Sequence, residues 1–400
     1  MSKPRRQANP FGPDGEAEAA RLAGRDAELA EIGFALRSIA LSDGEGRERK
    51  PIARWPIRLH GPPGSGKTAL LEAARRTAEE HGIHVVSVTS MPDLALDGQL
   101  VSGMIAGMGM AAFPWNLFIK LARYQKKRRR PGEGVGVYYA PLDRVMDVCL
   151  QKRPTALLLD HVPGYDVQSL RAFLLDYDWR LLDNFPMALL LAGTPEIWRT
   201  LNDTDVGLMD RSRIFDLATL APAAAREALN KPFEEQGVKV RDEALELMAS
   251  MADGYPQFIQ IVGHEVWEAW AAAGRDEVDV EDVSGAKDGI RQKRERFYQD
   301  ICGRIKTGGL VEHARHAMEL LDRNGGRVWK HTIVESIAGG FAEDGDRKAV
   351  DIYYELLDLG FIWSKDMDVE AGIPGLFDYC DRNNRRRAGL SAGEGRKERR

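Results

Sequence analysis

A glycine-rich segment, GPPGSGKT, occupies residues 61–68 and fits the pattern G-x-x-x-x-G-K-[ST] at every fixed position. It consists of Gly61, Pro62, Pro63, Gly64, Ser65, Gly66, Lys67 and Thr68. Glycines let consecutive backbone N–H groups turn toward one anion, and the start of a following helix adds the positive end of its dipole. We therefore expect this segment to cradle the phosphates of ATP. Lys67 should reach the β- and γ-phosphates, and the Thr68 hydroxyl should bind magnesium.

An acidic side chain that would complete the magnesium site follows an apolar run. The run TALLLD predicts a buried strand that ends at Asp160. Because such a strand is buried on both faces, an acid at its tip is either bound to a ligand or strained. We interpret Asp160 as the Walker B aspartate, a second metal-binding residue beside Thr68. The alternative is that Asp160 caps the next helix.

The residue after Asp160 bears on how fast ATP would be hydrolysed. ATPases of this kind mostly place a glutamate there to polarise the attacking water, whereas this chain has His161. A neutral histidine could act as a general base, but it holds a water less well in an anionic field. The alternative is that His161 is a loop residue and that hydrolysis is slow. Glu196 and Asp166 are the candidate substitutes for the missing glutamate.

The segment ALLLAGTPE at residues 188–196 predicts the next central strand, with Thr194 at its tip. A short polar side chain in that position can hold the attacking water or touch the γ-phosphate. We therefore predict that Thr194 acts as a sensor of the terminal phosphate.

The elements that must position these residues follow from five short apolar runs with helical stretches between them, a pattern typical of βαβ units with a parallel sheet. The predicted strands are Ile57–His60, Ile83–Thr89, Thr155–Asp160, Met187–Gly193 and Arg213–Leu217. The fold class is therefore α/β. Between the second and third strands lies an insertion, Leu100–Pro141, that carries a basic run at Lys126–Arg130. The part from Pro222 to about residue 273 reads as all-helical.

Composition sets limits on location and partners. The 400 residues carry a formal net charge of −5, so any contact with nucleic acid must come from local patches such as Lys126–Arg130 and Arg385–Arg387. No run of about 18 apolar residues and no secretory signal is evident, so we expect a cytoplasmic protein without a membrane partner. Cys149, Cys302 and Cys380 lack metal-ligand spacing, and we expect them to be buried free thiols in a reducing compartment.

The order of these parts resembles the AAA+ ATPases, within the branch that holds initiator, clamp-loader and STAND-type proteins. LAGRDAEL at residues 22–29 looks like the family motif that packs beside the adenine, which implies that Gly24 and Arg25 bind the cofactor. RSRIFDL at residues 211–217 is similar to the stretch that carries an arginine finger for the neighbouring subunit. Arg213 is the better match and Arg211 the second; the alternative is that both are ordinary surface arginines.

The rest of the resemblance concerns the helical part and the C-terminus. DGYPQFIQIVGHEVWEAW is similar to the family's second-sensor helix, but Gln257 stands where an arginine commonly contacts the γ-phosphate. GFIWSKDMDVEAGIPGLFDYC resembles the winged-helix domain of initiator-type members. The implied fold is a P-loop NTPase with a five-stranded parallel sheet flanked by helices, an all-helical lid and a C-terminal winged helix. The expected divisions are a flexible tail (1–20), the core (21–220), the lid (221–288), the winged-helix-like domain (289–380) and a basic disordered tail (381–400).

Two functions are compatible with these residues. The first is an ATPase whose nucleotide-dependent homo-oligomer acts on DNA, without reading its sequence, or on an unidentified DNA-bound partner protein, in replication, transposition or mobile-element defence. The alternative is a nucleotide-gated, STAND-like switch with slow hydrolysis, whose winged helix contacts protein. His161 and Gln257 favour the switch, whereas Thr194 and Arg213 favour the ATPase. The helix expected over DRKAVDIYYELLDL is acidic beyond its first residues, a poor surface for phosphates.

Overall fold

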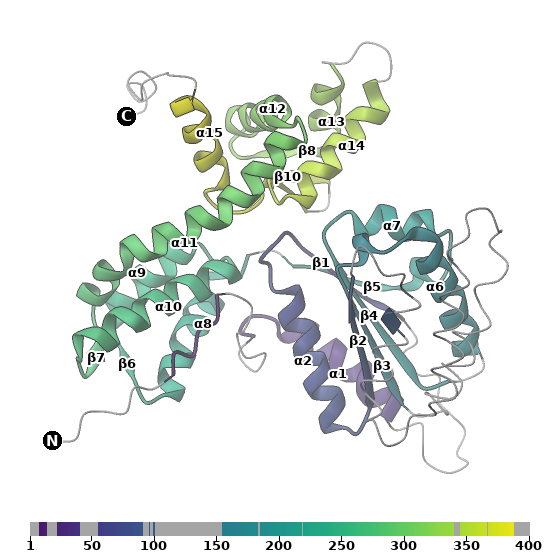
Figure 1. Ribbon diagram of the computed structural model, residues 1–400, viewed down its shortest axis with the longest axis horizontal. Helices are drawn as coiled ribbons and strands as arrows, with labels where there is room; N and C mark the ends of the chain where they lie inside the picture. Colours follow the sequence, from purple (N-terminus) through teal and green to yellow (C-terminus); the bar gives the residue numbers. More distant parts are fainter. Residues whose placement is uncertain are drawn as a thin grey trace, which may run out of the picture.

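The computed structural model describes residues 8–13, 22–40, 55–90, 96, 99–100, 154–182, 185–217, 219–339, 345–365 and 367–387. Figure 1 shows three groups of elements: a sheet with helices on both faces, a bundle of helices beside it, and a C-terminal group above the place where these two meet. Of the Leu100–Pro141 insertion, the structure describes Leu100. The rest of it, including the basic run Lys126–Arg130, lies outside the described residues. None of the described helices is long and apolar enough to cross a membrane.

The central sheet has five strands in the order β2-β3-β4-β1-β5, all parallel. The strands are β1 (Ile57–His60), β2 (His84–Thr89), β3 (Thr155–Asp160), β4 (Met187–Gly193) and β5 (Arg213–Asp216). The prediction of a five-stranded parallel sheet in an α/β fold is confirmed, and each strand lies within one residue of its expected bounds.

Helices cover both faces of the sheet, which explains why its strands are apolar without alternation. Leu157 and Leu159 of β3 belong to one hydrophobic cluster, whereas Ala156 and Leu158 point to the other. One face is covered by α1 (Asp26–Ala40) and α2 (Lys67–Glu80), and the other by α6 (Val167–Leu182) and α7 (Ile197–Asp203). Successive side chains of a strand point to opposite faces of the sheet. Because helices cover both faces, the side chains on both are buried. The carboxyl ends of β1, β3 and β4 then share one edge of the sheet.

The second group is mainly helical, as the sequence predicted for residues 222–273, but it also contains a short two-stranded sheet, β6-β7. Its elements are α8 (Pro222–Glu235), β6 (Lys239–Val240), α9 (Asp242–Ala252), α10 (Pro256–Ala273), β7 (Glu277–Val278) and α11 (Val280–Thr307). The structure corrects one expected boundary, because α11 continues without a break between residues 288 and 289. The polar stretch that precedes this boundary therefore forms β7 and the first turns of a long helix.

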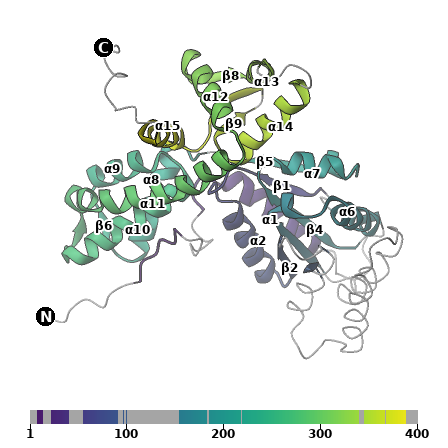
Figure 2. The ribbon, with the colours of Figure 1, turned by 45° about the horizontal axis from the view of Figure 1, so that its top comes forward.

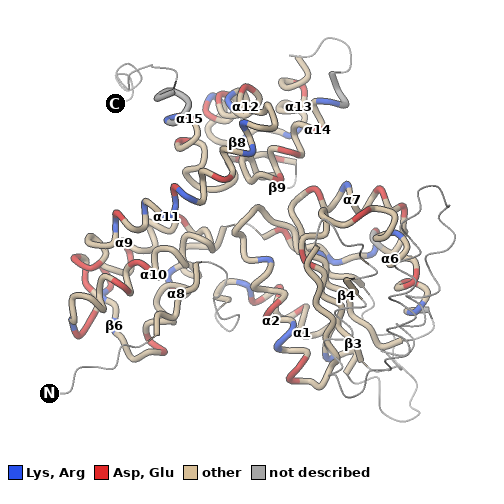
Figure 3. Tube along the Cα trace, in the orientation of Figure 1, with Lys and Arg blue, Asp and Glu red and all other residues tan. Residues whose placement is uncertain are grey.

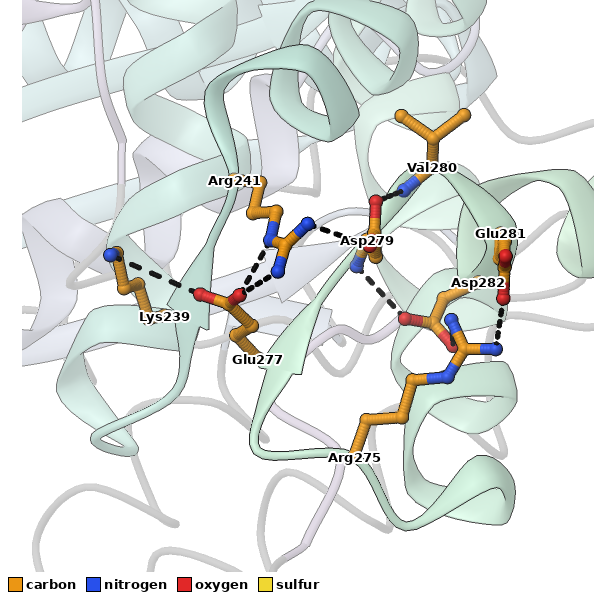
Figure 4. Close-up of polar contacts among 8 residues, drawn as sticks. All are labelled: Lys239, Arg241, Arg275, Glu277, Asp279, Val280, Glu281 and Asp282. Atoms are coloured by element: carbon orange, nitrogen blue, oxygen red, sulfur yellow. Dashed lines mark hydrogen bonds and ion pairs between the residues drawn. The ribbon is translucent and has the colours of Figure 1, made fainter.

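Acidic residues in this stretch start the helix by capping it (Figure 4). The Asp279 side chain accepts a hydrogen bond from the Val280 N–H at 2.6 Å, and Asp282 Oδ2 accepts one from the Asp279 N–H at 2.9 Å. The Asp279 side chain also accepts from the Asp282 N–H. This bond and the one from the Asp279 N–H to Asp282 form a capping box that satisfies N–H groups at the helix end. Arg241 binds Asp279 at 3.0 Å, and Arg275 lies 3.5 Å from Asp282. The acidic run is thus a helix start rather than a linker.

Replacing Asp279 by alanine should lower the free energy of unfolding by about 1 kcal/mol, because the cap of α11 is lost. Chemical denaturation followed by circular dichroism would measure this change. Asp288→Ala is the matched control, since Asp288 is an exposed acid on the same helix, 3.0 Å from Arg291. It should change stability by less than about 0.5 kcal/mol. Equal effects of the two substitutions would contradict the capping role.

The C-terminal group combines four helices with a small antiparallel sheet of strand order β8-β10-β9. Its elements are α12 (Val311–Arg323), β8 (Arg327–Trp329), α13 (Lys330–Ala338), α14 (Gly345–Asp358), β9 (Ile362–Lys365), β10 (Asp368–Ala371) and α15 (Leu376–Arg387). The backbone of α15 runs past residue 380, where we expected the disordered tail to begin, and includes residues 385–387.

A disulfide bond joins the second and third groups and corrects the expectation of free thiols. Cys302 on α11 is bonded to Cys380 on α15, at a sequence separation of 78. Cys149 lies outside the described residues. The cysteines therefore give no argument for a reducing compartment.

Residues 8–13 also depart from expectation, because they pack on the helical bundle rather than forming a flexible tail. The Phe11 ring is only 4% exposed and lies 5.3 Å from the Phe233 ring, centroid to centroid. Gly263 of α10 makes room for it, since a Cβ there would lie 2.3 Å from a Phe11 ring carbon. The Asn9 side chain donates to the His264 carbonyl at 3.2 Å. We call residues 8–13 the N-terminal strap.

Candidate functional site

The glycine-rich loop joins the carboxyl end of β1 to the start of α2, the arrangement that a phosphate cradle requires. The Lys67 ammonium lies inside the loop and donates to the carbonyls of Gly61 at 2.7 Å and Pro62 at 2.9 Å. Gly64 has φ +81°, and a Cβ there would lie 2.9 Å from the Gln257 Cβ. A glycine is therefore required at this position both by the backbone conformation and by the approach of the helical bundle.

The two predicted magnesium ligands lie together. The Thr68 hydroxyl donates to Asp160 Oδ2 at 2.7 Å, although the residues are 92 apart in sequence. Asp160 Oδ1 accepts a hydrogen bond from the His161 N–H at 2.8 Å. One carboxylate oxygen is therefore bound at the start of α2, and the other accepts from the residue that directly follows β3.

A hydroxyl and a carboxylate are oxygen donors of the kind that magnesium prefers, and magnesium in phosphate sites usually takes only one or two carboxylates from the protein. The residues present therefore fit the ion. No group of three or more His, Cys, Asp or Glu that could hold a metal occurs among the described residues. A metal at Thr68 and Asp160 would take its remaining ligands from phosphate and water.

Two buried polar residues of β1 lie behind the loop, and sequence reasoning missed them because it took β1 as a buried apolar run. The Arg58 guanidinium stacks on the Trp198 ring at 4.2 Å, and the His60 ring meets the same indole edge-on at 5.0 Å. Burial, Arg58 and Lys67 lower the pKa of His60 to about 3, so its ring is neutral at physiological pH. Burial lowers the pKa of Lys67 to about 8, against the opposing effect of Asp160.

The candidates for handling the attacking water occupy different environments. His161 is exposed and has φ +56°, an uncommon conformation for a residue with a side chain. Thr194 follows β4 at the same edge of the sheet. The Glu196 N–H donates to Asp358 at 2.5 Å. Asp166 Oδ2 accepts from the Ser169 N–H at 2.9 Å at the start of α6, so this carboxylate already serves a helix.

The helical bundle reaches the loop through the start of α10. The Tyr255 hydroxyl donates to the Pro63 carbonyl, and the Gln257 N–H donates to the Gly64 carbonyl at 3.2 Å. The Gln257 side chain instead donates to the Pro13 carbonyl of the N-terminal strap at 2.5 Å. Gln257 therefore lies at the loop as predicted by position, with its amide bound to the strap.

Gly24 and Arg25 lie on the other side of the loop. Arg25 is buried, and its guanidinium donates to the Ser65 carbonyl at 3.4 Å. Gly24 lies against the start of α8, where a Cβ at Gly24 would be 2.5 Å from the Ala224 Cβ. Both residues are thus brought to the edge of the phosphate loop.

The two predicted finger arginines are not part of this cluster. Arg213 pairs in register with Ile57, at the start of β1 and therefore one strand length from the loop. It is 62% exposed, with its Nε 3.7 Å from Glu31. Arg211, in a 3₁₀ turn over Met209–Arg211, is 55% exposed and 3.5 Å from Asp178. Both guanidinium groups are accessible from outside the subunit.

Two further residues at this edge were missed. Tyr255 lies in the segment DGYPQF, directly before the proline that starts α10. Its place two residues before Gln257, the predicted sensor position, could have indicated that it lies near the loop. Asp358 had no such signal, because it is one of several acids on a helix that the sequence placed in another domain. Only the fold brings it to the Glu196 N–H, two residues after Thr194.

No protein-family model matches the chain, and no curated protein matches its sequence. Among solved structures, a Walker-type ATPase of Pyrococcus abyssi matches with a TM-score of 0.55 and 13% identity, over 89% of this chain and 95% of that one. A RuvB variant of Thermotoga maritima matches with a TM-score of 0.46 and 16% identity, over 95% and 98%. The Orc1 protein of Aeropyrum pernix, solved with DNA, matches with a TM-score of 0.44 and 17% identity, over 92% of this chain and 95% of that one. The first of these shows a shared fold, that of a P-loop ATPase.

Proposed function

We propose that this protein binds ATP with magnesium and hydrolyses it slowly, as an ATPase of the AAA+ type. The observation that carries the proposal is the 2.7 Å hydrogen bond between Thr68 and Asp160, made directly beside the Lys67 loop. It joins the two oxygen donors that the sequence assigned to one magnesium ion. A loop of this sequence between a central strand and a helix supports the same conclusion.

Different residues at the edge of the sheet would bind the phosphates, hold magnesium and orient the attacking water. The loop N–H groups and the Lys67 ammonium would bind the phosphates, while Thr68 and Asp160 would hold magnesium, which neutralises charge that develops on the transferred phosphoryl group. Thr194 is placed at the tip of β4, where its hydroxyl could orient water or contact the terminal phosphate. No carboxylate follows Asp160, and this is the reason for proposing slow turnover.

Assembly into a homo-oligomer would complete the site. Arg213 and Arg211 are exposed and far from the loop of their own chain, as expected of residues that act on a neighbouring subunit's nucleotide. A guanidinium supplied in this way stabilises transition-state charge.

DNA, bound without sequence readout, is the partner that we propose for the first function. The order of α12, β8, α13, α14, β9 and β10, with its small antiparallel sheet, supports a winged helix. Figure 3 shows that Lys and Arg are interspersed with Asp and Glu along the described chain. Phosphate contacts would then depend on short local runs, of which Lys126–Arg130 is the strongest.

The nucleotide-gated switch is the second candidate, and one observation favours it. Helix α14, which would be the recognition helix of a winged helix, lies against α7 of the ATPase core in both views (Figures 1 and 2). Arg199 of α7 donates to Asp351 of α14 at 2.7 Å. A recognition helix used in this way contacts protein rather than DNA.

Steady-state phosphate release with and without duplex DNA would test the proposal. We expect the wild type to turn over more slowly than about 1 per second, near the lower end of usual enzyme rates. His161→Glu should increase turnover, because a carboxylate beside Asp160 can polarise the attacking water. Lys67→Met should abolish it.

The outcomes separate the two candidates. Turnover by the wild type faster than about 1 per second would contradict slow hydrolysis, and the slow switch with it. Slow turnover that DNA stimulates would support the DNA-directed ATPase. Nucleotide binding with slow turnover and no response to DNA would favour the switch. No phosphate release by either the wild type or His161→Glu would contradict ATPase activity altogether.

A further inference from the structure

A buried arginine, Arg58, lies in β1 three residues before the phosphate loop begins. Only 3% of it is exposed, and its backbone pairs with Leu191 of β4 on one side and Ile214 of β5 on the other. Its guanidinium lies 4.2 Å from the centroid of the Trp198 ring on α7. An arginine between apolar strands is an unusual choice, because burying a charge is costly unless a partner compensates it.

No carboxylate in the described part of the chain pairs with this guanidinium. The Arg58 side chain forms no hydrogen bond and no ion pair with another described residue, and its Nε atom is buried without a partner. Burial lowers the pKa of Arg58 to about 10, against the attraction of Asp210 and Asp216, so the side chain stays charged at physiological pH. Both of these acids are exposed, and water therefore weakens their effect on the buried charge.

Buried side chains fill the interior between Arg58 and the loop. His60, two residues further along β1 and 1% exposed, meets the Trp198 indole edge-on at 5.0 Å. Its neutral ring carries no charge that could oppose Arg58. A Cβ at Gly193 would lie 3.1 Å from the Ile197 Cβ, so α7 packs directly on this end of the sheet. A charge in such surroundings acts over a longer distance than one in water, because the effective dielectric constant is about 20 rather than about 80.

The phosphate loop lies within reach of this field. The Gly61 carbonyl, which the Lys67 ammonium binds at 2.7 Å, belongs to the third residue after Arg58, about 10 Å along the strand. Over such a distance in the protein interior, each unit of opposite charge on a ligand would be bound about five- to tenfold more tightly. The magnesium complex of ATP carries about two net negative charges and that of ADP about one, so the attraction differs between them.

We propose that the buried charge of Arg58 attracts the nucleotide's phosphates through the protein interior and sets the preference of the site for ATP over ADP, without touching either nucleotide. The inference rests on the proposed nucleotide site. Trp198 provides an aromatic face on which a guanidinium can be buried without a carboxylate. A carboxylate in that place would neutralise the charge and remove its effect on the ligand.

The test measures the affinities of ADP and of a non-hydrolysable ATP analogue, both with magnesium, by calorimetric titration of the full-length protein. Arg58→Met should weaken the binding of ADP about fivefold and that of the ATP analogue about 25-fold, because the loss grows with the charge of the ligand. A purely structural defect would weaken both by the same factor. Arg58→Lys keeps the charge and should bind both nucleotides within about threefold of the wild type.

Thermal unfolding without nucleotide gives a second measurement. Arg58→Met should unfold at the wild-type temperature or above it, because a buried charge without an ion-pair partner is removed. Arg180→Met is the matched control. Arg180 is 4% exposed and its guanidinium lies 5.4 Å from the Phe185 ring centroid, but its Nε is 2.8 Å from Asp176. This substitution should lower the unfolding temperature, because the ion pair with Asp176 is lost, and leave the ratio of the two affinities unchanged.

The proposal is overturned if Arg58→Met weakens both nucleotides by the same factor or leaves both affinities at the wild-type value. It is also overturned if Arg58→Met lowers the unfolding temperature as much as Arg180→Met does, since Arg58 would then serve the fold. A wild type that binds neither nucleotide would overturn the proposed function, and this inference with it. If Arg58→Met fails to fold, Arg58→Gln decides the question, with the same expected ratio.

Discussion

Replacing Lys67 by methionine should lower the affinity for ATP by about two orders of magnitude, with little change in thermal stability. The ammonium lies inside the loop, 2.7 Å from the Gly61 carbonyl and 2.9 Å from the Pro62 carbonyl. Bound phosphates would take these hydrogen bonds in charge-assisted form, each worth about 1.5–3 kcal/mol. Methionine keeps the length of the side chain but supplies neither the charge nor a donor.

Isothermal titration calorimetry with ATP and magnesium would measure the loss. Lys231→Met is the matched control, because Lys231 is an exposed lysine on α8. It should leave the affinity unchanged. An affinity within about threefold of the wild type for Lys67→Met would contradict the assignment of this loop as the phosphate site.

Removing the disulfide bond should lower the free energy of unfolding by about 4 kcal/mol, the scale expected for a bond that closes a loop of this length. Cys302 and Cys380 are 78 positions apart in sequence, so the unfolded chain gains considerable freedom when the bond is broken. The double variant Cys302→Ser with Cys380→Ser tests this by thermal unfolding. The C-terminal group should respond most, since the bond fixes α15 to α11.

A reducing agent provides the internal control for this prediction. It should lower the unfolding temperature of the wild type toward that of the double variant and leave the variant unchanged. Equal stability of the wild type and the double variant under oxidising conditions would show that the bond contributes nothing to the fold.

The sequence predicted the central sheet well because each of its strands is a continuous apolar run that must be buried on both faces. The phosphate loop was equally predictable, since its glycines and Lys67 lie within eight residues and act together locally. Thr68 and Asp160 could be paired in advance because parallel strands present their carboxyl ends at one edge. The strands and the loop have their cause within a short segment, and the Thr68–Asp160 pair follows from a general property of parallel sheets.

The features that sequence reasoning missed depend on contacts between distant segments. Phe11 packs on the helical bundle only because Gly263 and Phe233 leave a place for its ring, which no pattern near residue 11 reveals. Asp358 meets Glu196 across 162 residues of sequence. The acidic stretch before α11 looked like a linker because its charges are typical of loops, whereas their order forms a capping box. Composition alone could not distinguish a linker from the start of a helix.

The attachment of the helical bundle to the core has a mechanical consequence. The chain passes between the two bodies twice, once from the N-terminal strap to α1 and once between β5 and α8. The passages cross where Gly24 approaches Leu220 and Ala224. The covalent links between bundle and core thus meet at one place, about which the bundle can rotate. Arg25 directly follows this crossing, with its guanidinium on the Ser65 carbonyl. The angle of the bundle and the shape of the phosphate loop should therefore change together.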